Sequence, residues 1–230
     1  MKRFWTEVST LAAQDGWVIR LDSRAIQTPA RAPLVVPTKA LAAAIAEEWR
    51  LINDEINPRA MPLTGLANAA IDRIAPDRQA FAAGLAKYGE ADLACYRSEW
   101  PPELVKRQLA SWDPLLEWGR RRYDVDFATT SGLLHLPQAQ ATIDRLGHAV
   151  AELDAFHLAG LSPLVSIGGS LIAALAVLEK AITPEAAWEA ASIDEGWQLE
   201  QWGGDREAQT ALENRRRDFF AGARFLDLLG

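Results

Sequence analysis

The sequence has little or nothing of several features that mark common classes of protein. It holds one cysteine, Cys95, in 230 residues, which excludes an intramolecular disulfide and a zinc cluster of thiolates. It has no run of 18 apolar residues, so we expect no stable membrane insertion. Residues 1–7 lack the apolar core of a signal peptide and the arginine- and serine-rich character of a presequence. We therefore expect a cytoplasmic protein.

The motifs of common enzyme classes are missing as well. Neither GxxxxGK(S/T) nor GxGxxG occurs, which argues against a phosphate loop and a dinucleotide site. His135, His148 and His157 lack the spacing of a zinc-binding helix, and no HExxH or GxSxG occurs. Cys95 has no histidine near it in the sequence, which favours a buried core thiol over a nucleophile. We expect no catalytic residue, no cofactor and no metal.

The charge is acidic and unevenly distributed. The formal net charge of -7 argues against nucleic-acid binding, which requires a basic face. Residues 1–57 hold seven acids and seven bases, so the whole excess lies in residues 58–230. Residues 179–207 alone hold eight acids against two bases. The acidity is therefore a local property of the last quarter of the chain.

The pattern of apolar residues predicts an α+β protein with two domains. In residues 1–57, short β-branched runs between prolines predict a small, mainly antiparallel β domain. The expected strands are residues 3–8, 16–22, 25–28 and 34–36. Thr38 is typical of a helix N-cap, and the spacing of the next apolar residues predicts one amphipathic helix in this domain. These residues are Leu41, Ile45, Trp49 and Ile52.

Residues 58–230 predict a larger, all-α domain. Pro101-Pro102 opens a long helix, which Pro114 is expected to kink or split. The Gly168-Gly169 pair is typical of close helix packing. Further helix starts are expected at Thr64, Asp77, Ser162-Pro163 and Thr183-Pro184.

Two helical stripes are expected near the C-terminus, with a turn at Gly203-Gly204 between them. The first stripe consists of Trp188, Ser192, Glu195, Leu199 and Trp202. The second stripe consists of Ala208, Leu212, Arg215, Phe219 and Leu226.

Nine tryptophans stand beside only three tyrosines. Apolar helical stripes favour core packing for most of them. These are Trp49, Trp112, Trp118, Trp188 and Trp202. Trp5, Trp17 and Trp100 fall in strand or loop segments, where exposure to a partner is favoured.

Glu195 is the most informative acid, because it lies on the first stripe midway between Trp188 and Trp202. A carboxylate on an apolar face needs a partner. One interpretation is an ion pair with Arg215 of the next helix, and the other is a carboxylate that binds a partner protein. A general acid would also need a second group and a cleft, and the sequence points to neither.

Short motifs occur in a characteristic order along nearly the whole chain. They are residues 2–5, 16–22, 28–29, 36–38, 46–49, 61–64, 92–97 and 112–118, and then Asp194-Glu195, Gln198 and Trp202-Gly203. In this order they resemble the Atp-twelve family of ATP synthase assembly chaperones, which handle the alpha subunit of the catalytic head. The chain departs from the family at Gly65, residues 89–91 and Ala94, which we interpret as packing changes.

The resemblance implies a chaperone without enzymatic activity, in its bacterial form. It would bind the unassembled alpha subunit and prevent its aggregation until the beta subunit takes over. An acidic residue of the penultimate helical segment matters in this family, and Glu195 matches it best. We expect a monomer in which Trp49 and Asp113 are structural supports. The predicted partner-binding residues are Glu195, Asp194, Gln198, Trp202 and Asp205.

Two other functions stay open. A hydrolase that uses two carboxylates of the acidic segment would need a deep cleft in which Glu195 faces a second acid. A permanent structural adaptor would stay in a stoichiometric complex instead of releasing its client.

Overall fold

The computed structural model describes residues 2–132, 134–204 and 206–230. Contacts group the chain into two compact units. The first is Met1–Arg78 with Asp154–Gly160 and Arg224–Gly230, and the second is Gln79–Leu153 with Leu161–Ala223. This grouping differs from the boundary after residue 57, because the first unit continues to Arg78 and two later segments join it. The division into domains of residues 1–57 and 58–230 stays a prediction.

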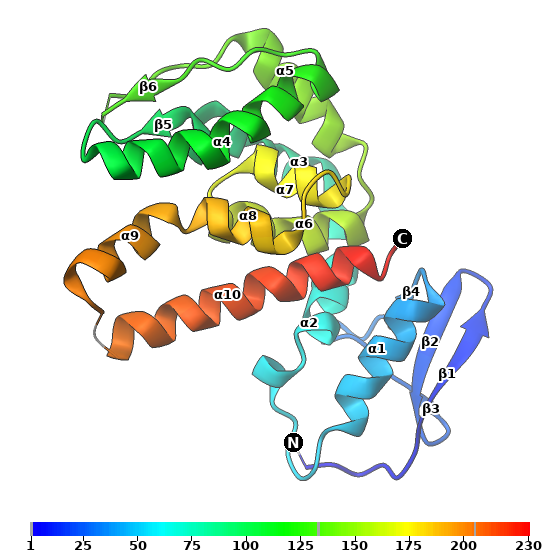
Figure 1. The fold of residues 1–230 in the computed structure, drawn as a ribbon. Helices are drawn as coiled ribbons and strands as arrows, with labels where there is room; N and C mark the ends of the chain where they lie inside the picture. Colours follow the sequence, from blue (N-terminus) through cyan, green and yellow to red (C-terminus); the bar gives the residue numbers. More distant parts are fainter. Residues whose placement is uncertain (1, 133, 205) are drawn as a thin grey trace. The chain divides into compact units, whose positions relative to one another are not determined.

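The first unit contains an antiparallel sheet (Figure 1). Its strands are β1 (Val8–Ala13), β2 (Gly16–Leu21), β3 (Arg24–Ala25) and β4 (Val35–Val36). β2 is central and pairs with the other three. Gly16 has a φ of +144°, and a Cβ at this position would lie 2.4 Å from the Val36 carbonyl oxygen, so only glycine fits here. The expected antiparallel sheet is confirmed.

The expected strand over residues 3–8 is wrong, because β1 begins only at Val8. Before it, Asp22 accepts hydrogen bonds from the amides of Thr6 and Glu7, at 3.0 and 2.9 Å. These two amides donate to the Asp22 side chain, so they are not available for hydrogen bonds to a neighbouring strand. These bonds also lower the pKa of the Asp22 carboxyl.

Helix α1 (Lys39–Arg50) contacts β1 and β2 in the first unit. The predicted cap is confirmed, because the Thr38 hydroxyl accepts a hydrogen bond from the Leu41 amide at 3.1 Å. The apolar face of α1 is buried as expected and includes Trp49. Trp5 is also buried, with its ring centroid 5.3 Å from that of Trp49. The expected exposure of Trp5 is therefore wrong.

Helix α2 (Pro62–Ala69) begins two residues before the expected start at Thr64. Its cap comes from another helix: the Glu48 carboxylate of α1 accepts hydrogen bonds from the amides of Leu63 and Thr64, both at 2.8 Å. The chain then continues through a π-helical turn (Ala70–Ile74) and a 3₁₀ turn (Ala75–Asp77). A cap supplied from a distant residue leaves no local signal in the sequence.

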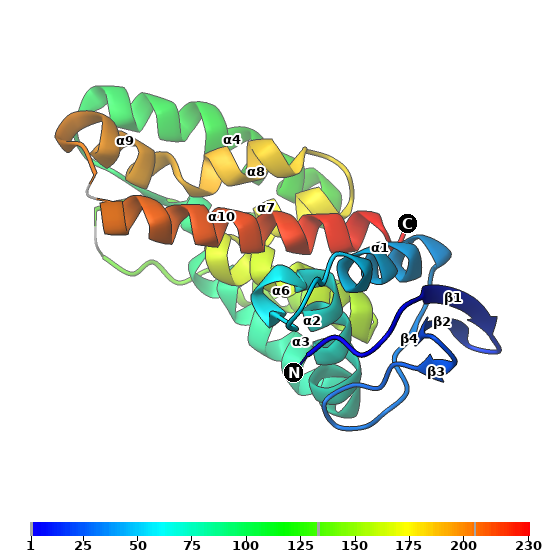
Figure 2. The same cartoon turned by 90° about the horizontal axis from the view of Figure 1, so that it is seen from below.

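The remaining helices make the chain mostly helical after residue 58, which confirms the α+β class. They are α3 (Arg78–Ala86), α4 (Pro102–Tyr123), α5 (Gln140–Ala151), α6 (Ala155–Gly168), α7 (Leu171–Leu178), α8 (Pro184–Ala191), α9 (Ile193–Trp202) and α10 (Arg206–Asp227). In the second unit α7 is the core element, since residues 171–177 are all buried. Helix α4 packs on α7 and buries Trp112, Leu115 and Leu116, and α8 lies beside α10 (Figure 2).

The start of α7 is fixed by a fully buried carboxylate. Asp92 accepts hydrogen bonds from the amides of Ala94 and Ile172, both at 3.0 Å. Burial raises the pKa of this carboxyl, although the hydrogen bonds oppose the shift. Asp92 therefore joins two segments that lie far apart in the sequence.

Three expectations about the helical region are wrong. Two short strands, β5 (Tyr96–Arg97) and β6 (Thr130–Ser131), pair in parallel within it. Helix α6 begins long before Ser162-Pro163, because Asp154 accepts hydrogen bonds from the amides of Phe156 and His157. Helix α4 runs on through Pro114, so the expected split at this residue is wrong, whereas the alternative of a kink stays a prediction. Pro114 lies on the exposed side of α4, and so does Ala110, whose carbonyl loses its amide donor and is left open to solvent.

Candidate partner-binding site

The predicted helix over residues 188–202 is in fact two helices. Helix α8 ends at Ala191 and α9 begins at Ile193. At the junction, the Ser192 hydroxyl donates a hydrogen bond to the Trp188 carbonyl at 2.7 Å, which competes with continued helix. Trp188 is buried against Phe219, with ring centroids 5.4 Å apart. By contrast, none of residues 193–202, all of which the structure describes, is buried.

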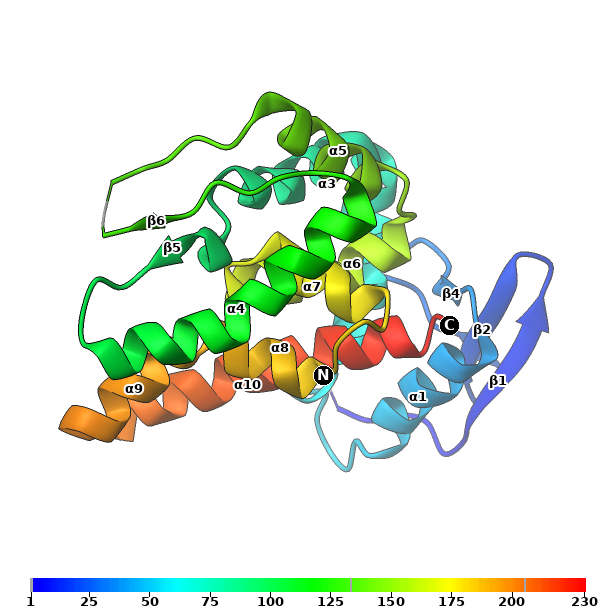
Figure 3. The same cartoon turned by 45° about the horizontal axis from the view of Figure 1, so that its top comes forward.

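Helix α9 lies beside the first half of α4 (Figure 3), and polar contacts hold the two helices together. Asp194 accepts a hydrogen bond from the side-chain amide of Gln108 at 2.7 Å. Arg107 donates a hydrogen bond to Glu200 at 2.8 Å, and its guanidinium carbon lies 4.9 Å from the ring centroid of Trp197. These contacts place α9 without burying it, so much of its surface stays open.

On its other side α9 is linked to α10 by an ion pair. Arg215 donates a hydrogen bond from Nη1 to Oε1 of Glu195, and from Nη2 to the Ile167 carbonyl at 3.2 Å. The interpretation of Glu195 as an ion-pair member is therefore confirmed. Both side chains are 42% exposed, so the pair is accessible from solvent. Glu195 faces a guanidinium and not the second carboxylate that a hydrolase would need.

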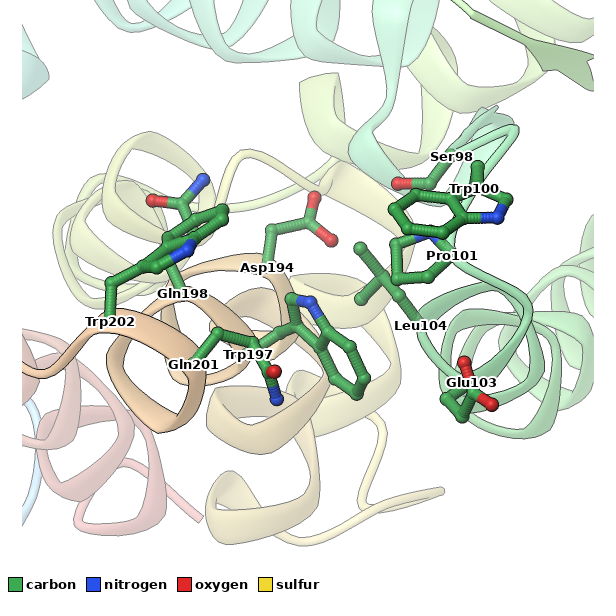
Figure 4. Close-up of a pocket in the computed structure, with 10 residues that line it drawn as sticks. All are labelled: Ser98, Trp100, Pro101, Glu103, Leu104, Asp194, Trp197, Gln198, Gln201 and Trp202. Carbon is green, nitrogen blue, oxygen red and sulfur yellow. The ribbon is translucent and has the colours of Figure 1, made fainter.

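A pocket of about 810 Å³ opens between α9 and the start of α4. Its lining residues are Ser98, Trp100, Pro101, Glu103, Leu104, Asp194, Trp197, Gln198, Gln201 and Trp202 (Figure 4). Trp100 and Trp202 are 76% and 78% exposed. Figure 4 shows them on opposite sides of the pocket, with Asp194 and Trp197 between them. The pocket is thus an open aromatic surface with a carboxylate at its centre.

A second depression, of about 440 Å³, lies between α9 and α10. Glu195 and Arg215 line it, and Gln198 and Trp202 line both depressions. The structure therefore brings four of the predicted partner-binding residues together on α9: Asp194, Glu195, Gln198 and Trp202. The fifth, Asp205, lies outside the described residues.

The tryptophans divide between buried and exposed positions differently from the prediction. The helical stripe favoured the core for Trp202, whereas Trp202 was also predicted among the partner-binding residues; it is exposed, because α9 turns away from the stripe on which Trp188 lies. Trp112 is buried as expected, and its indole donates a hydrogen bond to the Ala190 carbonyl at 2.8 Å. Sequence reasoning missed Trp197 and Glu103 in the pocket. Gln108 was a usable signal, since it is a buried polar residue on the apolar stripe of α4.

The sequence also raises a thiol nucleophile and a metal site as candidates. Cys95 is buried, and burial together with the nearby Asp92 charge raises its pKa to about 12, which makes it a poor nucleophile. Within residues 2–132, 134–204 and 206–230, no cluster of three acidic, histidine or cysteine residues is arranged to hold a metal. In the same part of the chain, no helix has both the length and the apolar character that a membrane crossing requires.

Comparison with known proteins identifies the family. A family model described as ATP12 chaperone protein matches residues 2–120. The crystal structure of Atp12 from Paracoccus denitrificans is 41% identical, covers 100% of this chain and 98% of its own, and superposes with a TM-score of 0.95. A candidate chaperone from Agrobacterium tumefaciens is 36% identical over 100% of this chain and 86% of its own, with a TM-score of 0.94.

A curated relative extends the comparison beyond bacteria. The mitochondrial protein atp12 of Schizosaccharomyces pombe is 25% identical over 214 residues, which are 88% of this chain and 74% of that protein. The resemblance found in the sequence is confirmed, and the hydrolase alternative is wrong. The chain therefore belongs to the ATP12 chaperone family and is a chaperone of ATP synthase assembly, not an enzyme.

Proposed function

We propose that the client of this chaperone is the unassembled alpha subunit of the ATP synthase catalytic head, and that α9 is the centre of the contact surface. The observation that carries the proposal is the exposure of α9. A helix that buries no residue contributes little to a core, and this one presents Trp202 together with the carboxylates of Asp194 and Glu195. Exposed tryptophan beside charge is typical of protein interfaces.

The proposed mechanism is temporary masking. An unassembled subunit exposes apolar interface that would otherwise aggregate, and the aromatic surface around α9 covers it. The acidic rim selects the partner and speeds encounter more than it raises affinity. Because the client must be released to the beta subunit, we expect a dissociation constant of about 1 μM, or about -8 kcal/mol.

Three further features belong to the same proposal. The chain acts as a monomer in the bacterial cytoplasm, it needs no cofactor, and it binds no nucleic acid. The excess of acids over bases, a formal net charge of -7, supports the last point because nucleic acid would be repelled. A permanent adaptor would differ in one respect, since it would remain bound after the beta subunit is added.

The test is co-expression of the alpha subunit alone with the chain and measurement of the soluble fraction of alpha. We expect more soluble alpha with the chain than without it, and release of alpha when beta is added. Equal precipitation with and without the chain would show that the proposed function is wrong. Retention of alpha after beta is added would support the adaptor.

A pair of substitutions tests the role of Glu195. Glu195→Gln and Arg215→Gln break the same ion pair, but only the first removes the carboxylate. If Glu195 contacts the client, Glu195→Gln reduces the soluble fraction of alpha and Arg215→Gln leaves it nearly unchanged. If both substitutions reduce it equally, the pair acts only by joining α9 to α10.

A further inference from the structure

We infer that the pocket between α9 and the start of α4 receives a client segment in which apolar side chains lie next to arginine or lysine. This inference rests on the proposed function and adds to it the chemical class of the segment. The pocket is the one lined by Trp100, Leu104, Asp194, Trp197 and Trp202.

The walls of the pocket favour apolar side chains. Trp100 and Trp202 are largely exposed on opposite sides of it. Pro101 and Leu104, at the start of α4, add apolar atoms to its lining. A volume of about 810 Å³ falls in the range of sites that hold a ligand of several rings or side chains. Two indoles facing one open pocket are matched to an aromatic or aliphatic anchor.

The charge of the pocket favours a cation beside that anchor. Of the described residues that line it, Asp194 and Glu103 are acidic and none is lysine or arginine. The neighbouring acids of α9 are already neutralised, Glu195 by Arg215 and Glu200 by Arg107. Asp194 accepts a hydrogen bond from Gln108, which is a neutral donor, and among the described residues it forms no ion pair with a lysine or arginine.

The indole rings of the pocket also favour a cation. Trp197 already carries a cation, since the Arg107 guanidinium lies over its ring. Among the described residues, no arginine or lysine lies over Trp100 or Trp202 in this way. Guanidinium and ammonium groups bind such faces favourably. A second copy of this chain fits the pocket poorly, because it would bring its own net charge of -7 to an acidic site.

The experiment measures the binding of fluorescently labelled peptides to the full chain by anisotropy at low salt. The first peptide is Gly-Ser-Leu-Arg-Phe-Leu-Arg-Ser-Gly. Matched peptides replace both arginines with glutamine, both arginines with glutamate, or the three apolar residues with serine. We expect the first peptide to bind at least about 10-fold more tightly than each of the other three.

Substitutions in the chain locate the binding. Trp202→Ala removes an exposed indole, and Asp194→Asn removes the charge while keeping the size of the side chain, so both variants should fold. Each should weaken binding of the first peptide about 10-fold. The controls are Leu51→Ala, an equally exposed apolar residue of the first unit, and Asp15→Asn, an exposed acid between β1 and β2. Both controls should bind like the unsubstituted chain.

The outcomes separate this inference from the proposed function. The inference is overturned if the glutamine or glutamate peptide binds as tightly as the first, if no peptide binds, or if Trp202→Ala and Asp194→Asn leave binding unchanged. It is also overturned if both variants keep alpha soluble as well as the unsubstituted chain does, and the chaperone role then still stands. If the unsubstituted chain fails to keep alpha soluble, the proposed function fails, whatever the peptides show.

Discussion

The guanidinium of Arg107 on α4 lies over the indole of Trp197 on α9 and donates a hydrogen bond to Glu200, less than one turn further along α9. One side chain thus makes two of the contacts that hold an unburied helix in place. These contacts are exposed, so they are weak individually and sensitive to salt.

Arg107→Ala should therefore loosen α9 without unfolding the protein. We expect faster amide hydrogen exchange in residues 193–202 and unchanged exchange in the buried helix α7. The measurement is hydrogen exchange followed by mass spectrometry. Lys106→Ala, which removes an exposed cation from the preceding position, should leave the exchange of α9 unchanged. Equal protection of α9 in both variants would show that Arg107 does not hold it.

The same contact predicts a pH dependence. The hydrogen bond from Arg107 lowers the pKa of Glu200 below its ordinary value of 4.5. A lowered pKa means that the contact is intact above that value and is lost as the pH falls through the lower pKa of the folded protein. The contact should therefore be fully present at neutral pH.

Trp112 and Trp202 should differ sharply when each is replaced by alanine. Trp112 is 1% exposed and Trp202 is 78% exposed. Loss of the buried indole should lower the free energy of unfolding by about 3–5 kcal/mol, whereas loss of the exposed one should change it by less than about 0.5 kcal/mol. Urea unfolding followed by circular dichroism measures both. A similar loss for the two variants would contradict the exposure of Trp202.

Asp92→Ala should destabilise the protein strongly, because it leaves the buried amides of Ala94 and Ile172 without their acceptor. We expect a loss of about 3 kcal/mol in the free energy of unfolding, measured by urea titration. Asp144→Ala, which removes an exposed acid from α5, is the control and should be nearly neutral.

The pH dependence of this loss has a definite sign. Burial raises the pKa of Asp92 above its ordinary value of 3.8, so the folded chain binds this proton more tightly than the unfolded chain does. The contribution of Asp92 to stability is therefore greatest below that value and declines as the pH rises toward the raised pKa. The difference between the unsubstituted chain and Asp92→Ala should shrink over this range. A difference that grows would contradict the raised pKa.

Cys95 should react slowly with thiol reagents in the folded protein. Its pKa is raised from 9.0 to about 12, which lowers the thiolate fraction at about pH 8 by about 1000-fold. The reaction with Ellman's reagent should be fast in guanidinium chloride and nearly absent without it. Rapid reaction of the folded protein would show that the thiol is not held as described.

Local patterns in the sequence predicted much of the fold. The β-branched run of β2, the Thr38 cap and the apolar spacing of α1 are local signals, and each was confirmed. The Glu48 cap of α2 and the two-residue strands β5 and β6 depend on residues far apart in the chain, so no local pattern marks them. The family itself was found because many short motifs keep their order.

The candidate site was harder to predict for a physical reason. The spacing of Trp188, Glu195 and Trp202 shows that they fit one helical face, but it shows neither that the helix breaks at Ser192 nor which face meets the core. The ion pair of Glu195 with Arg215 was predicted because a carboxylate on an apolar stripe needs a partner. The pocket was missed because Trp100 and Trp202 are brought together only by the packing of α9 on α4.

We propose that this chain keeps the unassembled alpha subunit soluble through the surface of α9. The most direct test is light scattering after purified, unfolded alpha subunit is diluted into buffer containing the chain, Trp202→Ala or Leu51→Ala. We expect low scattering with the unsubstituted chain and with Leu51→Ala, and high scattering with Trp202→Ala. Equal scattering in all three cases and in buffer alone would contradict this proposal.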